Sequence, residues 1–180
     1  MKIFIALLRG INVSGQKQIK MSELKSLFED TGFQNVETYI QSGNVIFSAI
    51  EKSSKKLEEK ISSSIKTKFG FDVQVIVLTP DEIEYVIKTN PFIKKKKDIE
   101  KLYVTFLAKF PSDENIKKLN AIDYSPEEYI IDGRNIYLFV PNGYGKAKLN
   151  NNLFENKLKV FGTTRNIKTI KALFELTDSH

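Results

Sequence analysis

The sequence contains no cysteine, and its single histidine, His180, is the last residue. Without cysteine the chain has no disulfides, thiolate nucleophiles, iron–sulfur clusters or Cys-based zinc sites. A histidine at the chain end gives no support for a Ser-His-Asp triad or a His-rich metal site. Any acid–base chemistry would depend on Asp, Glu, Lys or Tyr, and we expect neither a metal nor a cofactor.

Long hydrophobic runs are also missing. The first apolar run, residues 3–8, ends at Arg9, whereas the core of a signal peptide needs roughly 7 to 15 apolar residues. No later run approaches the roughly 20 residues of a membrane span. An apolar content of 41% over 180 residues is sufficient for a folded core. We therefore expect a folded cytoplasmic protein without a membrane partner.

Positive charge is concentrated in the second half of the chain. The net charge is +6, and the segment 144–171 alone contains seven basic residues and one acidic residue. Such a segment can attract phosphate groups. A solvated lysine-rich surface has the same composition, because 25 of the 28 basic residues are lysine. Both interpretations remain open.

The first half has the order strand, helix, strand, strand, helix, strand. The predicted elements are residues 2–8, 22–30, 36–41, 44–48, a helix from 54 to 69, and 72–78. The two middle strands form a hairpin around Ser42-Gly43. Thr79 and Glu82 form a capping box that opens a short helix ending before Asn90. The βαββαβ order is the split-βαβ or ferredoxin-like pattern.

The second half repeats this order after a lysine-rich segment, residues 91–100, that we interpret as a linker. The string "KLYVTFL" resembles "KIFIALL" at the N-terminus, and a hairpin over 129–140 turns at Asp132-Gly133. Helices are predicted over 112–119, 147–160 and 164–176, without a final strand. The sequence thus predicts an α+β protein with two ferredoxin-like halves related by internal duplication, 1–90 and 101–180. The second half is degenerate and has an extra C-terminal helix.

Two loops of the first half are expected to lie at the same end of its sheet. In this topology the loop "RGIN" after the first strand neighbours the hairpin turn "QSGN". A guanidinium, amides and glycine backbone N–H groups together suit phosphate or carboxylate. A hairpin turn alone also explains Ser42-Gly43. The loop after the first strand is longer than its counterpart near 108–112, and such insertions often carry function. The candidate residues are Arg9, Gly10, Asn12, Gln41, Ser42, Gly43 and Asn44.

The string "TTRN" near the C-terminus suggests a second anion site. Thr163 or Thr164 is a suitable N-cap for the predicted final helix. Arg165 in its first turn would oppose the helix dipole, unless an anion lies beside both. The alternative is an ion pair with Glu155 or Asp132. The nearby "PNGYGKAKL" lacks the spacing of a P-loop.

The strings "LRGIN", "YIQSGN" and "TTRN" together closely resemble a bacterial family, domain of unknown function 1697. The resemblance covers nearly the whole chain, and it implies an α+β fold of two ferredoxin-like halves with no established activity. Ala147 and Ile167 stand where the family commonly has Ser and Trp. The signature positions in this sequence are Arg9, Gly10, Asn12, Gln41, Ser42, Gly43, Asn44, Lys148, Thr164, Arg165 and Asn166.

Several functions remain open at this stage. The first is binding of a phosphate-bearing small ligand, a nucleotide or phosphorylated metabolite, by the "RGIN" and "QSGN" loops with help from Arg165 and Lys148. The second is nucleic-acid binding through the basic C-terminal segment. The third is an enzyme, for which Asp132 is the best single base, although Asp-Gly is also a common turn pair. The fourth is a non-catalytic protein that binds a partner.

Overall fold

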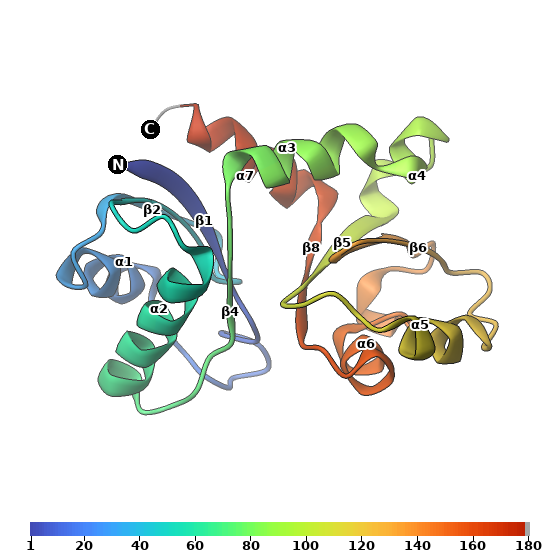
Figure 1. Cartoon of the computed structure of the whole chain (residues 1–180), viewed down its shortest axis with the longest axis horizontal. Coiled ribbons are helices and arrows are strands. Elements are labelled where there is room, and N and C mark those ends of the chain that lie inside the picture. The colour runs from blue at the N-terminus through green and yellow to red at the C-terminus, as the bar shows by residue number, and fades with distance from the viewer. Residues whose placement is uncertain (179–180) are drawn as a thin grey trace. The chain divides into compact units, whose positions relative to one another are not determined.

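The computed structural model in Figure 1 describes residues 1–178, and His180 lies outside them. The chain divides into two compact units. Unit 1 contains Met1–Glu84 together with the C-terminal residues from Ala172, and unit 2 is Tyr85–Lys171. Each unit has one four-stranded antiparallel sheet with helices, so the fold is mixed α+β.

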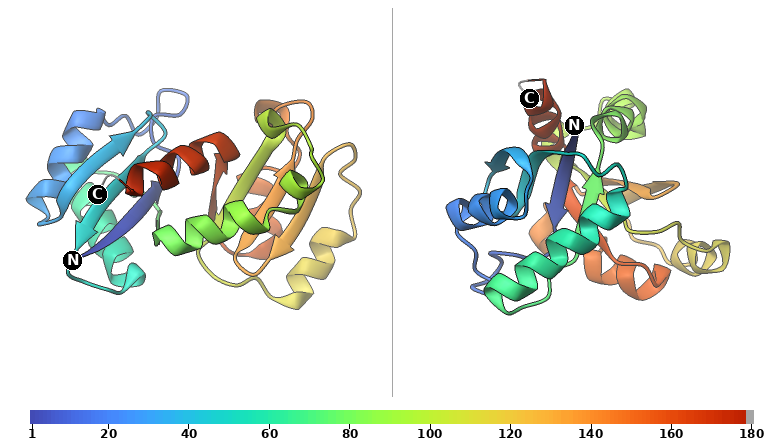
Figure 2. Two further views of the ribbon diagram at one scale, coloured as in Figure 1. Left: turned by 90° about the horizontal axis from the view of Figure 1, so that it is seen from above. Right: turned by 60° about the vertical axis from the view of Figure 1, so that its left-hand side comes forward.

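Unit 1 contains the six elements expected from the sequence, with shifted ends. In chain order they are β1 (Lys2–Leu8), α1 (Met21–Asp30), β2 (Gln34–Tyr39), β3 (Asn44–Ala49), α2 (Ser54–Phe69) and β4 (Val75–Leu78). The order across the sheet is β2-β3-β1-β4, so β1 is hydrogen-bonded on both sides. Figure 2 shows α1 and α2 on the same face of this sheet.

Aromatic packing fills the space between this sheet and its helices. Phe47 of β3 lies at the centre, with ring centroids 5.9 Å from Phe4, 5.4 Å from Phe28 and 4.6 Å from Phe33. The opposite face of β1 is buried as well, at Ile5 and elsewhere along the strand. A strand that is apolar on both faces is therefore buried on both faces, as its sequence predicts.

Local signals in the sequence set several helix ends. The capping box is confirmed, because Thr79 N–H donates to Glu82 Oε2 at 2.9 Å and Glu82 N–H donates to Thr79 Oγ1 at 3.3 Å. The helix that it opens, α3 (Pro80–Thr89), stops before Asn90 as expected. For α2, Ser53 rather than Ser54 is the N-cap, and Gly70 ends the helix with a φ of +80°.

Unit 2 has the same strand order as unit 1. Its elements after α3 are α4 (Pro91–Lys94), the 3₁₀ helix η1 (Ile99–Lys101), β5 (Leu102–Leu107), α5 (Asp113–Asn120), β6 (Glu128–Asp132), β7 (Asn135–Phe139), the 3₁₀ helix η2 (Tyr144–Lys146), α6 (Asn151–Leu158), β8 (Gly162–Asn166) and α7 (Ile167–Thr177). Its sheet order is β6-β7-β5-β8. The expected linker, 91–100, instead contains α4 with a buried Phe92, and the two units divide within α3 and α7.

The prediction that the second half lacks its final strand is wrong. Residues 162–166, "GTTRN", form β8, which pairs antiparallel with β5. The final helix starts at Ile167 rather than at Thr164. Thr is β-branched and fits a strand as well as an N-cap, so pairing with β5 decided between two locally acceptable states. Helix α7 follows β8, just as α3 follows β4.

Both predicted hairpins exist, but their turns differ from the prediction. In unit 1 the strands end at Tyr39 and resume at Asn44, which leaves a turn of four residues, 40–43, instead of two. In unit 2 Asp132 pairs with Asn135, so the turn is Gly133-Arg134 rather than Asp132-Gly133. Unit 1 therefore has the longer turn.

No helix within residues 1–178 has the length and apolar character needed to cross a bilayer. The same residues contain no group of three or more His, Cys, Asp or Glu side chains placed to hold a metal ion.

We predict that Phe47→Ala lowers the free energy of unfolding by about 3 to 5 kcal/mol, because it empties the centre of the aromatic cluster. Urea denaturation followed by circular dichroism measures this loss. The matched control is Phe110→Ala, since Phe110 is 73% exposed, and it should change stability by less than about 0.5 kcal/mol. Equal losses in the two variants would contradict the position assigned to Phe47.

Candidate functional site

The "RGIN" and "QSGN" segments, residues 9–12 and 41–44, meet at the end of β1, as the topology predicts. Leu8 N–H donates to Gly43 O at 2.8 Å, which continues the β1–β3 ladder into the turn. The side-chain amide of Asn12 donates to Gln41 O at 2.9 Å. We call these two segments the loop pair.

Gly43 lets the two segments of the loop pair approach each other. Its φ is +78°, and an added Cβ would lie 2.6 Å from Ile11 Cδ1 and 2.9 Å from Leu8 Cβ. Real Cβ atoms do not approach other atoms this closely, so a side chain here would push the loops apart. Gly10 also has a positive φ, +71°, but an added Cβ would meet open space.

The two asparagines of the loop pair maintain its shape. Asn12 Nδ2 donates to Ile19 O as well as to Gln41 O, and Ile19 N–H donates to Asn12 Oδ1 at 2.8 Å. Asn44 is fully buried, and its amide donates to Tyr39 O at 2.9 Å and to Ser42 Oγ at 3.1 Å. These amide N–H groups bind the backbone and a neighbouring hydroxyl, which assigns both residues a structural role.

Left-handed backbone conformations are concentrated in these loops. Asn12, Ser14 and Lys17 have φ values of 55°, 50° and 46°. Ile40, at the start of the β2–β3 turn, has a φ of 51° although it is β-branched and 47% exposed. A β-branched residue rarely adopts this region, and such strain is typical of functional loops held by their surroundings.

The surface of the loop pair carries positive charge. Arg9 is half-buried. Its backbone N–H donates to Gln74 O at 2.9 Å, which fixes the backbone at the base of the side chain. Gln41 is exposed and Ser42 is half-buried. Segments 9–20 and 40–44 contain Arg9, Lys17 and Lys20 and no acidic residue. A guanidinium with amides and a hydroxyl suits a phosphate group.

The remaining predicted residues lie in unit 2. Thr164 Oγ1 donates to Asn151 Oδ1 at 2.7 Å, and Arg165, 8% exposed, donates from Nη1 to Thr163 Oγ1 at 2.7 Å and Thr164 O at 3.0 Å. Arg165 belongs to a strand, so the expected conflict with a helix dipole does not arise.

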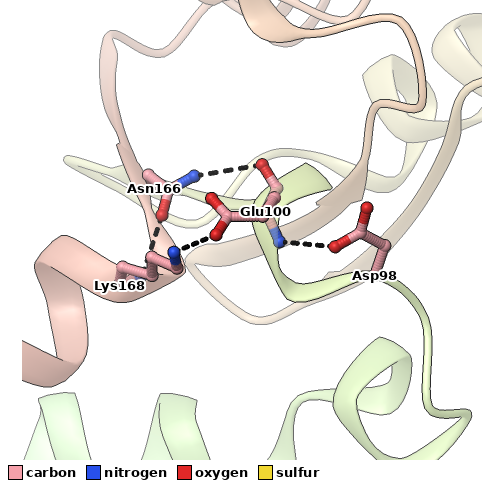
Figure 3. Close-up of polar contacts among 4 residues, drawn as sticks. All are labelled: Asp98, Glu100, Asn166 and Lys168. Carbon is pink, nitrogen blue, oxygen red and sulfur yellow. Dashed lines mark hydrogen bonds and ion pairs between the residues drawn. The ribbon is translucent and has the colours of Figure 1, made fainter.

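Asn166 connects β8 to α7 (Figure 3). Its Oδ1 accepts the N–H of Lys168 at 2.8 Å, and its Nδ2 donates to Glu100 O at 3.5 Å. Lys168 Nζ forms an ion pair with Glu100, whose own N–H donates to Asp98 at 3.0 Å. The predicted ligand-binding position 166 thus caps the helix that begins after it.

Lys148 lies before α6 and is exposed. Its N–H donates to Glu127 Oε1 at 2.9 Å, and the next N–H, of Leu149, donates to Glu127 Oε2 at 2.8 Å. Glu127 is 9% exposed, and the two charge-assisted hydrogen bonds satisfy its buried carboxylate. The carboxylate thus holds the backbone from which the Lys148 side chain projects.

Asp132, the best single base that the sequence offers, accepts a hydrogen bond of 2.9 Å from the Tyr85 hydroxyl. This hydrogen bond and the negative charge of Asp132 raise the pKa of Tyr85. Tyr85 therefore stays protonated and donating at neutral pH, and Asp132 is held at the end of its hairpin.

One concave surface of unit 2 was missed by the sequence interpretation. It is a cleft of about 730 Å³ beside α5, whose lining includes Phe110, Asp113, Asp123, Tyr124, Glu127 and Tyr129. We call it the α5 cleft. The signal for it was the presence of both acidic and tyrosine residues in "IDYSPEEY", residues 122–129. That string has no regular period, so only the structure shows that it curves around a cleft.

Comparison with known proteins identifies a family and a solved structure of similar fold. The sequence model of a family described as "Protein of unknown function (DUF1697)" matches residues 1–137. The conserved bacterial protein SP0830 from Streptococcus pneumoniae has a similar fold, with a TM-score of 0.77 and 24% sequence identity over 96% of this chain and 97% of that chain. None of the curated proteins matches significantly. These similarities support the fold.

We predict different costs for alanine at the two glycines of the loop pair. Gly10→Ala adds only left-handed strain, about 1 to 2 kcal/mol. Gly43→Ala adds the same strain together with overpacking against Ile11, for a total of about 2 to 5 kcal/mol. Urea denaturation of both variants tests the difference. A Gly43→Ala protein as stable as Gly10→Ala would show that the loops need no close approach.

Proposed function

The chain belongs to the DUF1697 family. We propose that its loop pair binds a phosphate-bearing small ligand, a nucleotide or a phosphorylated metabolite. The proposed contacts are the guanidinium of Arg9, the backbone at Gly10, and the polar groups of Gln41 and Ser42. Asn12, Gly43 and Asn44 hold the two segments in place. The family carries no activity that would identify the ligand.

A comparison of the two units carries this proposal. Both sheets have the same strand order, yet the connection between the first strand and the first helix has twelve residues in unit 1, 9–20, and five in unit 2, 108–112. The hairpin turn is also longer in unit 1, at residues 40–43, than in unit 2, at 133–134. Both extensions contain residues of the loop pair. Added loop length on a shared scaffold favours function at that end.

The chemistry of the extended loops favours a phosphate. Arg9 can form two parallel hydrogen bonds to phosphate oxygens, and a glycine with a positive φ lets backbone N–H groups converge on an anion. Lys17 lies farther along the same loop as Arg9, and its Nζ donates to the backbone carbonyl of Asp72 at 2.6 Å. Segments 9–20 and 40–44 themselves contain no acidic residue, and Asp72 lies beside Lys17.

We further propose that the two units are ferredoxin-like and arose by internal duplication. Equivalent backbone hydrogen bonds support this. Leu8 N–H donates to Gly43 O and Leu107 N–H donates to Arg134 O, both at 2.8 Å. The residue after each strand, Arg9 or Ala108, donates to the segment before the last strand of its sheet, at 2.9 and 3.0 Å respectively.

The ligand is sought by thermal shift of the full chain with inorganic phosphate, AMP, ATP, ribose 5-phosphate and a single-stranded DNA 12-mer. A ligand at 100 times its dissociation constant adds about 2.7 kcal/mol of stability. For a chain of this length the transition should rise by about 5 to 10 °C. A shift by one small phosphate compound that persists at physiological salt supports the proposal.

Arg9→Ala is expected to weaken binding of that compound at least about tenfold, because a charge-assisted bidentate contact contributes about 1.5 to 3 kcal/mol. Arg134→Ala is the matched control, since Arg134 is a half-buried arginine at the hairpin turn of unit 2. Isothermal titration measures both variants. Equal affinities of Arg9→Ala and the parent would refute the proposal. Shifts only with the oligonucleotide, lost as salt increases, would favour nucleic-acid binding by the basic C-terminal segment.

A further inference from the structure

We propose that the α5 cleft of unit 2 binds a small organic cation, an ammonium or guanidinium group on an apolar stem. This inference is independent of the loop pair, because every residue that lines the cleft belongs to unit 2 and to the segment 110–133.

The lining of the cleft is acidic in a basic protein. It contains three carboxylates, those of Asp113, Asp123 and Glu127. Among the described residues no Lys or Arg lines the cleft, although the net charge of the chain is +6. Glu127 is committed to the backbone N–H groups of Lys148 and Leu149. Asp113 and Asp123 therefore supply the negative charge that a ligand meets.

Asp123 is held in the ionised form. Its Oδ1 accepts hydrogen bonds from the hydroxyl of Ser125 at 2.6 Å and from the N–H of Ser125 at 2.9 Å. These bonds, with a smaller contribution from the charge of Lys148, lower the pKa of Asp123. Both hydrogen bonds use one carboxylate oxygen, so Oδ2 keeps its acceptor capacity for a cation.

Aromatic side chains form the apolar part of the cleft. Phe110 is 73% exposed, which is unusual for a phenylalanine, and it lies beside the Gly133 backbone. Tyr124 and Tyr129 form an edge-to-face pair with centroids 5.9 Å apart. Aromatic faces near carboxylates attract ammonium and guanidinium groups, and they cover the apolar stem that carries such a group.

Tyr124 provides an independent indication of a ligand. The residue is 6% exposed and lines the cleft, but its hydroxyl has no hydrogen-bond partner among the described residues. A buried hydroxyl without a partner is costly and uncommon. By contrast, the hydroxyl of the neighbouring Tyr129 donates to Asn120 Oδ1 at 2.5 Å. The Tyr124 hydroxyl is covered in this structure, so an ammonium or guanidinium N–H group reaches its oxygen only when the ring or its neighbours move.

The test is an NMR titration of the ¹⁵N-labelled full chain with benzylamine as the probe. Benzyl alcohol, which has the same shape without the charge, and benzoate, which has the opposite charge, are the comparison ligands. We expect benzylamine to shift the amide signals of residues 110–133 with a millimolar or lower Kd, and both comparison ligands to bind at least tenfold more weakly. Equal binding of benzyl alcohol, or no shift with benzylamine, would overturn the proposal.

Variants that replace one carboxylate by an amide show which aspartate binds the cation. Asp113→Asn and Asp123→Asn should each weaken benzylamine about threefold to fivefold, the range expected for one exposed ion pair. Glu114→Gln is the matched control, because Glu114 is adjacent in α5, pairs with Lys118 at 2.6 Å and does not line the cleft. Arg9→Ala should leave the titration unchanged. Unchanged affinity in both aspartate variants would overturn the proposal even if benzylamine binds.

Two further ligands distinguish the sources of such a cation. The tripeptides Gly-Lys-Gly and Gly-Arg-Gly represent a basic side chain of a polypeptide, and spermidine represents a free amine. Tighter binding of a tripeptide than of spermidine assigns the cleft to a polypeptide side chain, and the reverse order assigns it to a metabolite amine. Either order supports the proposed chemistry, whereas the failure of all three ligands to displace benzylamine would overturn it.

Discussion

The close approach of the β2–β3 turn to the end of β1 determines the geometry of the loop pair. It requires a residue without a side chain at position 43, because a Cβ there would collide with Ile11 and Leu8. The approach lets Leu8 N–H reach Gly43 O and lets Asn12 reach Gln41 O. The positions of Arg9 and Gly10 follow from these contacts. Two hydrogen bonds and the lack of a side chain at Gly43 thus position Arg9 and Gly10, the predicted ligand contacts.

The residues predicted for the site are of two physical kinds. Asn12, Gly43 and Asn44 are explained by architecture, since their polar groups or lack of a side chain hold the loops together. Asn166 belongs with them, because it caps α7. Arg9 and Gln41 differ, since they lie at the surface of this framework with polar side chains. The sequence alone does not separate residues that hold the loops from residues with exposed polar groups, whereas hydrogen-bond partners and burial do.

The two units combine a common strand order with opposite surface chemistry. Unit 1 has a long basic loop after β1, residues 9–20, whereas unit 2 has a short loop after β5 and an acidic, aromatic cleft beside α5. Strand order depends on backbone pairing and buried apolar residues, which leaves loops and helix surfaces free to differ. The same strand order can therefore carry surfaces of different charge.

The sequence by itself determined the features that depend on neighbouring residues. The Thr79–Glu82 capping box and the end of α2 at Gly70 arise from contacts within a few positions. The hairpins were predicted from apolar and polar residues on either side of their turns. The topology of unit 1 also allowed the meeting of the "RGIN" and "QSGN" loops to be predicted. That "TTRN" is a strand depends on tertiary pairing, because its Thr residues suit both a helix cap and a strand. Its pairing partner, β5, lies about 60 residues away in the chain. The α5 cleft likewise depends on tertiary packing, between a helix, a loop and a sheet. This packing leaves no periodic signal in the sequence.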